Sequence, residues 1–179
     1  MVQGSDDQRP RQSASGRFPI VAVGGSAGAL GAFQELLEGL PGDARLALVV
    51  VTHQEADRAS LLPEILARCT PMPVTQVVDG VAAEPGRVYV AAPGRYLSLR
   101  DGVFRLEQVV ERGHPPLPVD YFMRSLAQDQ RSRAVGIVVS GTGSDGTLGL
   151  AAIRSESGLT LAQTCGRRCG RAARCRAWA

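Results

Sequence analysis

The stretch FPIVAVGGSAGALGAFQELLEGL, residues 18–40, predicts the fold class of this chain. It begins with an unbroken apolar run at residues 18–23, which is typical of a parallel strand covered on both faces. A glycine-rich turn, GGSAG, occupies residues 24–28, and residues 29–40 then repeat Leu and Phe at helical spacing. A buried strand, a tight turn and an amphipathic helix in this order indicate an α/β protein.

The same alternation continues along the rest of the chain. Further strands are predicted at 44–52, 73–78, 87–92, 134–140 and 158–163, and further helices at 60–69, 119–130 and 147–157. Asp101-Gly102 separates two strand-like segments, 96–100 and 103–107, which is a strong signal for a two-residue hairpin. We therefore predict a doubly wound, mostly parallel sheet with helices on both faces and a small β-hairpin.

Length and composition indicate one domain with two dissimilar ends. The 179 residues fit a single domain, which we place at residues 18–163. Residues 1–17 are polar and are expected to form a disordered lead-in. Residues 164–179 hold five Arg and three Cys but no acidic residue. We interpret them as a non-native-looking tail, such as a shifted reading frame produces in a GC-rich gene. The alternative is a native Arg-rich binding tail.

Charge and hydropathy exclude several classes of function. Residues 1–163 carry 15 Arg and all 17 acidic residues, a formal charge of −2, and aromatic residues make up only 4% of the chain. A nucleic-acid-binding face would combine basic and aromatic residues, so we expect no nucleic-acid partner. No apolar run is long enough for a membrane span or a secretory signal, so we expect no membrane insertion and a cytoplasmic location. The Cys spacings do not match zinc-binding pairs, and no metal or other cofactor is predicted.

Three polar residues that could carry chemistry follow predicted strands. Ser26, His53 and Asp145 each lie just past the C-terminal end of such a strand. In open α/β sheets these ends meet at one edge, where active sites form. A nucleophile, a base and an acid at one edge are the minimum set for a serine hydrolase, and Ser26 lies in a G-x-S-x-G turn. Each residue also has a structural alternative: Ser26 and Asp145 as helix N-caps, and His53 as a loop or packing residue.

Five longer motifs occur in order between about Phe18 and Gln163. They are GGSAGAL (24–30), VVVTHQ (49–54), the loop TPMPV…DG…GRVYVAAPGRYL (70–97), LPVDYFMRSLA (117–127) and SGTGSDGTLGL (140–150). Each is weak alone, but their joint occurrence over most of the chain is specific. Together they resemble the catalytic domain of the chemotaxis protein-glutamate methylesterase (CheB) family.

The resemblance implies a role for each of the polar residues. Ser26 would be the nucleophile, His53 the general base and Asp145 the orienting acid. The backbone N–H groups of Ala27, Thr142 and Gly143 would form the oxyanion hole. The family hydrolyses glutamyl methyl esters on methyl-accepting chemoreceptors to glutamate and methanol, and some members deamidate glutamine.

Two departures from the family's usual pattern shape the domain prediction. The 17 polar residues at the N-terminus leave no room for the family's phosphoryl-accepting receiver domain, so the chain resembles free-standing or methyltransferase-fused esterase domains. After Gln163 the tail replaces the family's continuation, so we predict a C-terminally truncated catalytic domain. The apolar residues of the last predicted strand are then expected to stay exposed to water.

Other interpretations remain open from the sequence alone. Asp120 could replace Asp145 as the orienting acid. Gly25-x-x-Gly28-x-x-Gly31 could be a Rossmann-like nucleotide-binding fingerprint, although that motif expects an acidic residue near the position of His53. A catalytically impaired interaction domain is the third possibility. Hydrolysis of a simple ester separates the esterase from the other two.

Overall fold

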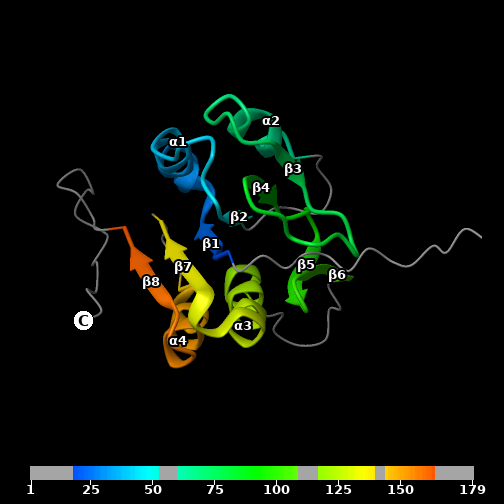
Figure 1. Cartoon of the computed structure of the whole chain (residues 1–179), viewed down its shortest axis with the longest axis vertical. Coiled ribbons are helices and arrows are strands. Elements are labelled where there is room, and N and C mark those ends of the chain that lie inside the picture. Colours follow the sequence, from blue (N-terminus) through cyan, green and yellow to red (C-terminus); the bar gives the residue numbers. More distant parts are fainter. Residues whose placement is uncertain (1–17, 53–59, 109–116, 140–143, 164–179) are drawn as a thin grey trace, which may run out of the picture.

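The computed structural model describes residues 18–52, 60–108, 117–139 and 144–163 (Figure 1). Six strands form one parallel sheet in the order β3-β4-β2-β1-β7-β8. These strands are β1 (Ile20–Gly25), β2 (Ala47–Thr52), β3 (Val74–Gln76), β4 (Arg87–Val90), β7 (Ala134–Val138) and β8 (Leu159–Ala162). The predicted doubly wound sheet is confirmed.

Helices cover both faces of this sheet. They are α1 (Leu30–Glu38), α2 (Leu62–Leu66), α3 (Pro118–Gln130) and α4 (Thr147–Ser155), with short 3-10 turns η1 (Ala27–Ala29) and η2 (Arg131–Arg133). In Figure 1, α1 and α2 lie above the sheet and α3 and α4 lie below it. Within the described ranges, none of the helices has the length and apolar character needed to cross a bilayer.

The apolar run in β1 is explained by two separate cores. Ile20 and Ala22 pack in one core with α3, α4 and the hairpin, whereas Val21 and Val23 pack in the other with α1 and α2. Successive strand residues point to opposite faces, so a strand between two helical layers must be apolar at every position. The continuous apolar pattern is therefore the signature of the central place of β1 in the sheet.

The predicted hairpin forms beside the main sheet and packs on α3. Its strands are β5 (Arg95–Arg100) and β6 (Val103–Gln108). Asp101 and Gly102 both have positive φ, 53° and 72°, as a tight two-residue hairpin turn requires. The N–H groups of both turn residues donate to the Asp129 carboxylate at the end of α3, with the Gly102 nitrogen 3.1 Å from Oδ2. The hairpin is thus anchored to α3 through its turn.

The helices differ in extent from the prediction, α1 and α2 the most. α2 ends at Leu66 instead of continuing to Cys69, because the N–H groups of Arg68 and Cys69 bond to carbonyls three residues back, which tightens the last turn. The helix predicted at 29–40 is α1, which begins at Leu30 and ends at Glu38, and Ala29 belongs to the preceding turn η1. The sequence patterns therefore place these elements correctly but misjudge their ends.

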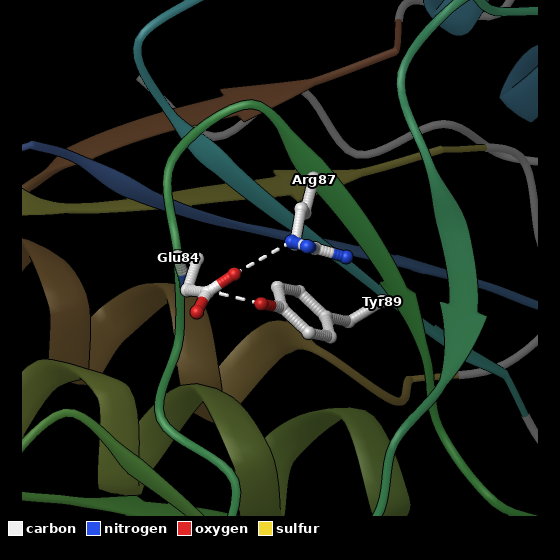
Figure 2. Close-up of polar contacts among 3 residues, drawn as sticks. All are labelled: Glu84, Arg87 and Tyr89. Carbon is white, nitrogen blue, oxygen red and sulfur yellow. Dashed lines mark hydrogen bonds and ion pairs between the residues drawn. The ribbon is translucent and has the colours of Figure 1, made fainter.

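A polar contact near the amino-terminal end of β4 has a structural role. Figure 2 shows Glu84 beside Arg87 and Tyr89 at the start of β4, where Arg87 pairs with the first residue of β2. The Tyr89 hydroxyl accepts a hydrogen bond from the Glu84 N–H at 3.0 Å, and Arg87 Nε lies 2.7 Å from Glu84 Oε2. Both charged side chains are largely exposed, so this ion pair is worth only about 0–1 kcal/mol. It closes the turn before β4, far from the carboxyl ends of the strands.

The edge strand β8 leaves apolar side chains exposed. Leu159 and Leu161 are 57% and 48% exposed, although both face the same side of the sheet as the partly buried Val135 and Ile137 of β7. An apolar face of this kind loses the stabilisation that burial gives elsewhere in the sheet.

Candidate active site

The order of the strands places a topological switch point at the carboxyl end of β1. The chain adds β2 and β4 on one side of β1 and later returns to add β7 and β8 on the other side. In open α/β sheets, such a reversal of strand order opens a crevice between the loops that follow the two central strands. Here these are β1, which leads to Ser26, and β7, which leads toward Asp145.

Ser26 lies in the sharp connection between β1 and η1. Its backbone is extended, with φ −90° and ψ −176°, and its side chain makes no capping hydrogen bond to the helix that follows. Only its carbonyl takes part in the turn, by accepting a hydrogen bond from the Ala29 N–H at 2.9 Å. Ser26 therefore holds the N-cap position of η1, but its side chain does not act as the cap, so capping does not occupy the hydroxyl.

The glycines before Ser26 are required by close packing. A Cβ at Gly24 would lie 2.2 Å from Val119 Cγ1, and a Cβ at Gly25 would lie 2.5 Å from Ala29 Cβ. Neither side chain can be accommodated without movement, so α3 and the η1 turn approach the end of β1 as closely as backbone allows. This packing fixes the path of the chain on which Ser26 stands.

The two later glycines show no such requirement. A Cβ at Gly28 or Gly31 would meet no atom within 4 Å. In a dinucleotide-binding fingerprint the last glycine is needed because the helix packs closely on the strand. The fingerprint Gly25-x-x-Gly28-x-x-Gly31 therefore receives no support from the packing.

Asp145 caps the N-terminus of α3. Its Oδ1 accepts a hydrogen bond from the Asp120 N–H at 2.9 Å, and its Oδ2 accepts one from the Val119 N–H at 3.2 Å. The helix that follows Asp145, α4, has Gly146 as its N-cap, with φ 95°. Asp145 is thus a helix cap, as the structural alternative proposed, but of a helix that precedes it by about 25 residues in the chain.

Val119 brings Asp145 to the end of β1. It is almost fully buried, and its Cγ1 lies close to both Gly24 and Gly146: a Cβ added to Gly146 would be 3.2 Å from it. The end of β1, the start of α3 and the turn at Asp145 therefore meet around one side chain. The sequence gives no sign that Val119 belongs to the site, because its apolar character indicates only burial.

The surroundings of the Asp145 carboxyl raise its pKa. Burial raises its pKa, the N–H groups of Asp120 and Val119 oppose this by favouring the carboxylate, and the Asp120 carboxylate raises it further. A pKa raised by folding means that this group's contribution to stability falls as pH rises from the ordinary value through the raised one. Ionised Asp145 at neutral pH therefore lowers the free energy of unfolding. Perturbed pKa values of this kind are common at functional sites.

Tyr96 is a second residue of this region that the sequence did not single out. Burial and the negative charge of Asp145 raise the pKa of its phenol. Its ring packs against Tyr121, in the first turns of α3, with the ring centroids 4.9 Å apart. Tyr96 therefore lies near enough to Asp145 to be affected by its charge. The alternation in β5 places Tyr96 on the same side as Ser98 and Arg100, opposite the buried Leu97 and Leu99, so it predicts neither the burial of Tyr96 nor its neighbour.

Of the candidate residues Asp120, His53, Thr142 and Gly143, the structure describes Asp120. Asp120 is 5% exposed and turns toward α4, where its Oδ1 accepts the Gly149 N–H at 2.7 Å. His53, Thr142 and Gly143 lie outside the described residues. The register pairs Gly25 with Thr52, so β1 and β2 end side by side, one residue before Ser26 and His53 respectively. In the part of the chain that the structure describes, no three potential metal ligands are grouped together.

Known proteins are similar to this chain in both sequence and fold. The family model described as CheB methylesterase matches residues 21–167. A protein-glutamate methylesterase/protein-glutamine glutaminase of Pseudomonas putida is 34% identical over 86% of this chain and 46% of its own length. A second such protein, from Burkholderia lata, is 36% identical over 83% of this chain and 44% of its own length. The chain thus spans less than half of each of these relatives.

A solved structure agrees with the family match. The crystal structure of the Thermotoga maritima CheB methylesterase catalytic domain superimposes with a TM-score of 0.74 at 25% identity. The match covers 80% of this chain and 78% of that one. Strand order, the turn after β1 and the sequence match therefore lead to one conclusion: the chain belongs to the CheB methylesterase family.

Proposed function

We propose that this chain is a serine esterase that hydrolyses glutamyl methyl esters on proteins, with methyl-accepting chemoreceptors as the substrates. The observation that carries the proposal is the position of Ser26, directly after the closely packed Gly24 and Gly25 that end β1, at the topological switch point of the sheet and within the region that matches the family. Further support comes from the names of the relatives, which also include a glutaminase activity. Deamidation of glutamine would use the same acyl-transfer chemistry.

In the proposed mechanism, Ser26 Oγ attacks the ester carbonyl and His53 accepts the hydroxyl proton. The oxyanion that forms is stabilised by backbone N–H groups of Ala27, Thr142 and Gly143. His53 then returns the proton to the departing methoxide, which leaves as methanol, and the glutamyl group remains bonded to Ser26. Water activated by His53 hydrolyses this acyl-enzyme and restores the serine.

Asp145 would orient the imidazole and stabilise its protonated form. A carboxylate offers about four lone-pair directions. The N–H groups of Val119 and Asp120 use two of them, and the Gly146 N–H also bonds to the carboxylate. A remaining direction can accept the N–H of His53. An imidazolium beside Asp145 would favour the carboxylate and so offset the raised pKa.

The proposal is tested with a peptide that carries one glutamyl γ-methyl ester. We expect the 179-residue chain to release methanol and convert the ester to glutamate, with a matched glutamine peptide showing any deamidation as released ammonia. A fluorophosphonate should abolish both reactions, because it reacts with base-activated serines.

Two outcomes would contradict the proposal. Binding of the methylated peptide without any turnover would favour an interaction domain. A rise in melting temperature on addition of a dinucleotide, with no ester hydrolysis, would favour the nucleotide-binding alternative.

A further inference from the structure

We infer that Asp120 is a positioning residue of the proposed active site: it ties the start of α4 to the start of α3 and thereby fixes the Asp145 carboxylate. The inference rests on the proposed function, because it assigns Asp120 to the support of the acid in that mechanism. Asp120 touches backbone and not the reacting atoms, so its effect would pass through Asp145.

The two aspartates form a reciprocal pair of caps. Asp145, which precedes α4, accepts the N–H groups of Val119 and Asp120 in the first turn of α3. Asp120, in α3, accepts the N–H of Gly149 in the first turn of α4. N–H groups in a first turn have no partner within their own helix, and each N-terminus favours negative charge. We call this arrangement the crossed cap.

The crossed cap sits where the two helices touch directly. A Cβ at Gly149 would lie only 2.5 Å from Met123 Cβ, so the backbone of α4 packs directly against the Met123 side chain of α3. Gly149 is buried and lies four residues after Asp145. The Gly149 N–H has no access to bulk water, so loss of the Asp120 carboxylate would leave it unsatisfied and favour a shift of the first turn of α4.

Such a shift would move the Asp145 carboxylate. The directions of the free lone pairs of Asp145 depend on the angle at which its carboxylate meets the α3 amides. That angle depends in turn on where the turn at Asp145 and Gly146 lies relative to α3. A displacement of about 1 Å in a positioned catalytic group can cost about 100-fold in rate.

Asp129 offers a matched control on the same helix. Its carboxylate accepts two backbone N–H groups, those of Asp101 and Gly102, where the Asp120 carboxylate accepts that of Gly149, and it lies at the other end of α3 and binds the hairpin turn. Asp129→Ala and Asp120→Ala therefore remove the same kind of contact. Only Asp120 is linked to the proposed site.

The test measures the labelling of the full chain by a fluorophosphonate, as the first-order rate constant at saturation and the probe concentration at half-saturation. We expect Asp120→Ala to lower the rate constant about 10- to 100-fold with the half-saturating concentration unchanged. Asp120→Asn keeps an oxygen that can accept the Gly149 N–H and should restore the rate to within about threefold of the original. Asp129→Ala should label within about twofold of the original, although both alanine variants melt about 3–6 °C lower.

Equal labelling of the Asp120→Ala and Asp129→Ala variants would overturn the inference, because Asp120 would then contribute to stability alone. An Asp120→Asn variant as slow as Asp120→Ala would also overturn it, because the charge and not the cap would be responsible. If Asp120→Ala does not fold, Asp120→Ser takes its place, since the shorter hydroxyl falls short of Gly149. Failure of the original chain to label at Ser26 would refute the proposed function itself, and is thereby distinguished from failure of this inference.

Discussion

Replacing His53 with alanine is expected to lower the rate of ester hydrolysis by about 10⁶. In a serine protease, loss of either the nucleophile or the base lowers kcat by about 10⁶, and loss of both costs no more than loss of one. The reason is that the serine hydroxyl is a poor nucleophile until a base removes its proton. The variants to compare are His53→Ala, Ser26→Ala and the double variant, with initial rates on p-nitrophenyl acetate.

The rate of the double variant relative to the single variants shows whether Ser26 and His53 depend on each other. If the two residues act as a unit, the double variant will be no slower than either single variant. Additive losses would mean that Ser26 and His53 act independently. A His53→Ala variant that keeps most of its activity would show that another group serves as the base. His114→Ala is the matched control, because it removes the only other histidine of the chain and should leave the rate unchanged.

Asp145→Asn is expected to lower turnover by about 10⁴, the loss that the comparable change causes in a serine protease. An amide favours the wrong imidazole tautomer and does not stabilise the imidazolium. The amide also has one acceptor oxygen where the carboxylate has two, so it can satisfy only one of the Val119 and Asp120 N–H groups. We therefore expect a lower melting temperature as well, and circular dichroism should show whether the variant is folded.

Asp120→Asn distinguishes between the two candidate acids. If Asp145 is the orienting acid, Asp120→Asn should keep most of the activity, because its amide oxygen can still accept the Gly149 N–H. The opposite result, a nearly silent Asp145→Asn and a damaging Asp120→Asn, would assign the role to Asp120. Single-turnover rates of the two variants decide between these outcomes.

The sequence predicts the elements of this fold because their signals are local. The apolar run at β1 reflects burial on both faces, and Asp101-Gly102 specifies a turn with two positive φ angles. Both signals are contained in a few neighbouring residues, so no tertiary information is needed to interpret them. The ends of α2 were harder to predict, because a tightened last turn has no marked sequence signal.

The candidate site was predicted less completely, because its geometry depends on contacts between distant segments. The position of Asp145 after a strand indicated the correct edge of the sheet, but its hydrogen bonds are to residues about 25 positions earlier. Periodicity marks Val119 only as buried, and cannot show that it joins Gly24 to Gly146. Likewise, a polar residue at the start of a helix signals a cap, but not which helix it caps.

The assignment of Ser26 as the nucleophile is tested by identifying the residue that a fluorophosphonate modifies. The full chain is treated with the probe, digested and analysed by mass spectrometry. We expect one labelled serine, Ser26, and no labelling of the Ser26→Ala and His53→Ala variants, because only a base-activated hydroxyl reacts rapidly. Labelling at another serine, or undiminished labelling of Ser26→Ala, would show that Ser26 is not the nucleophile of this chain.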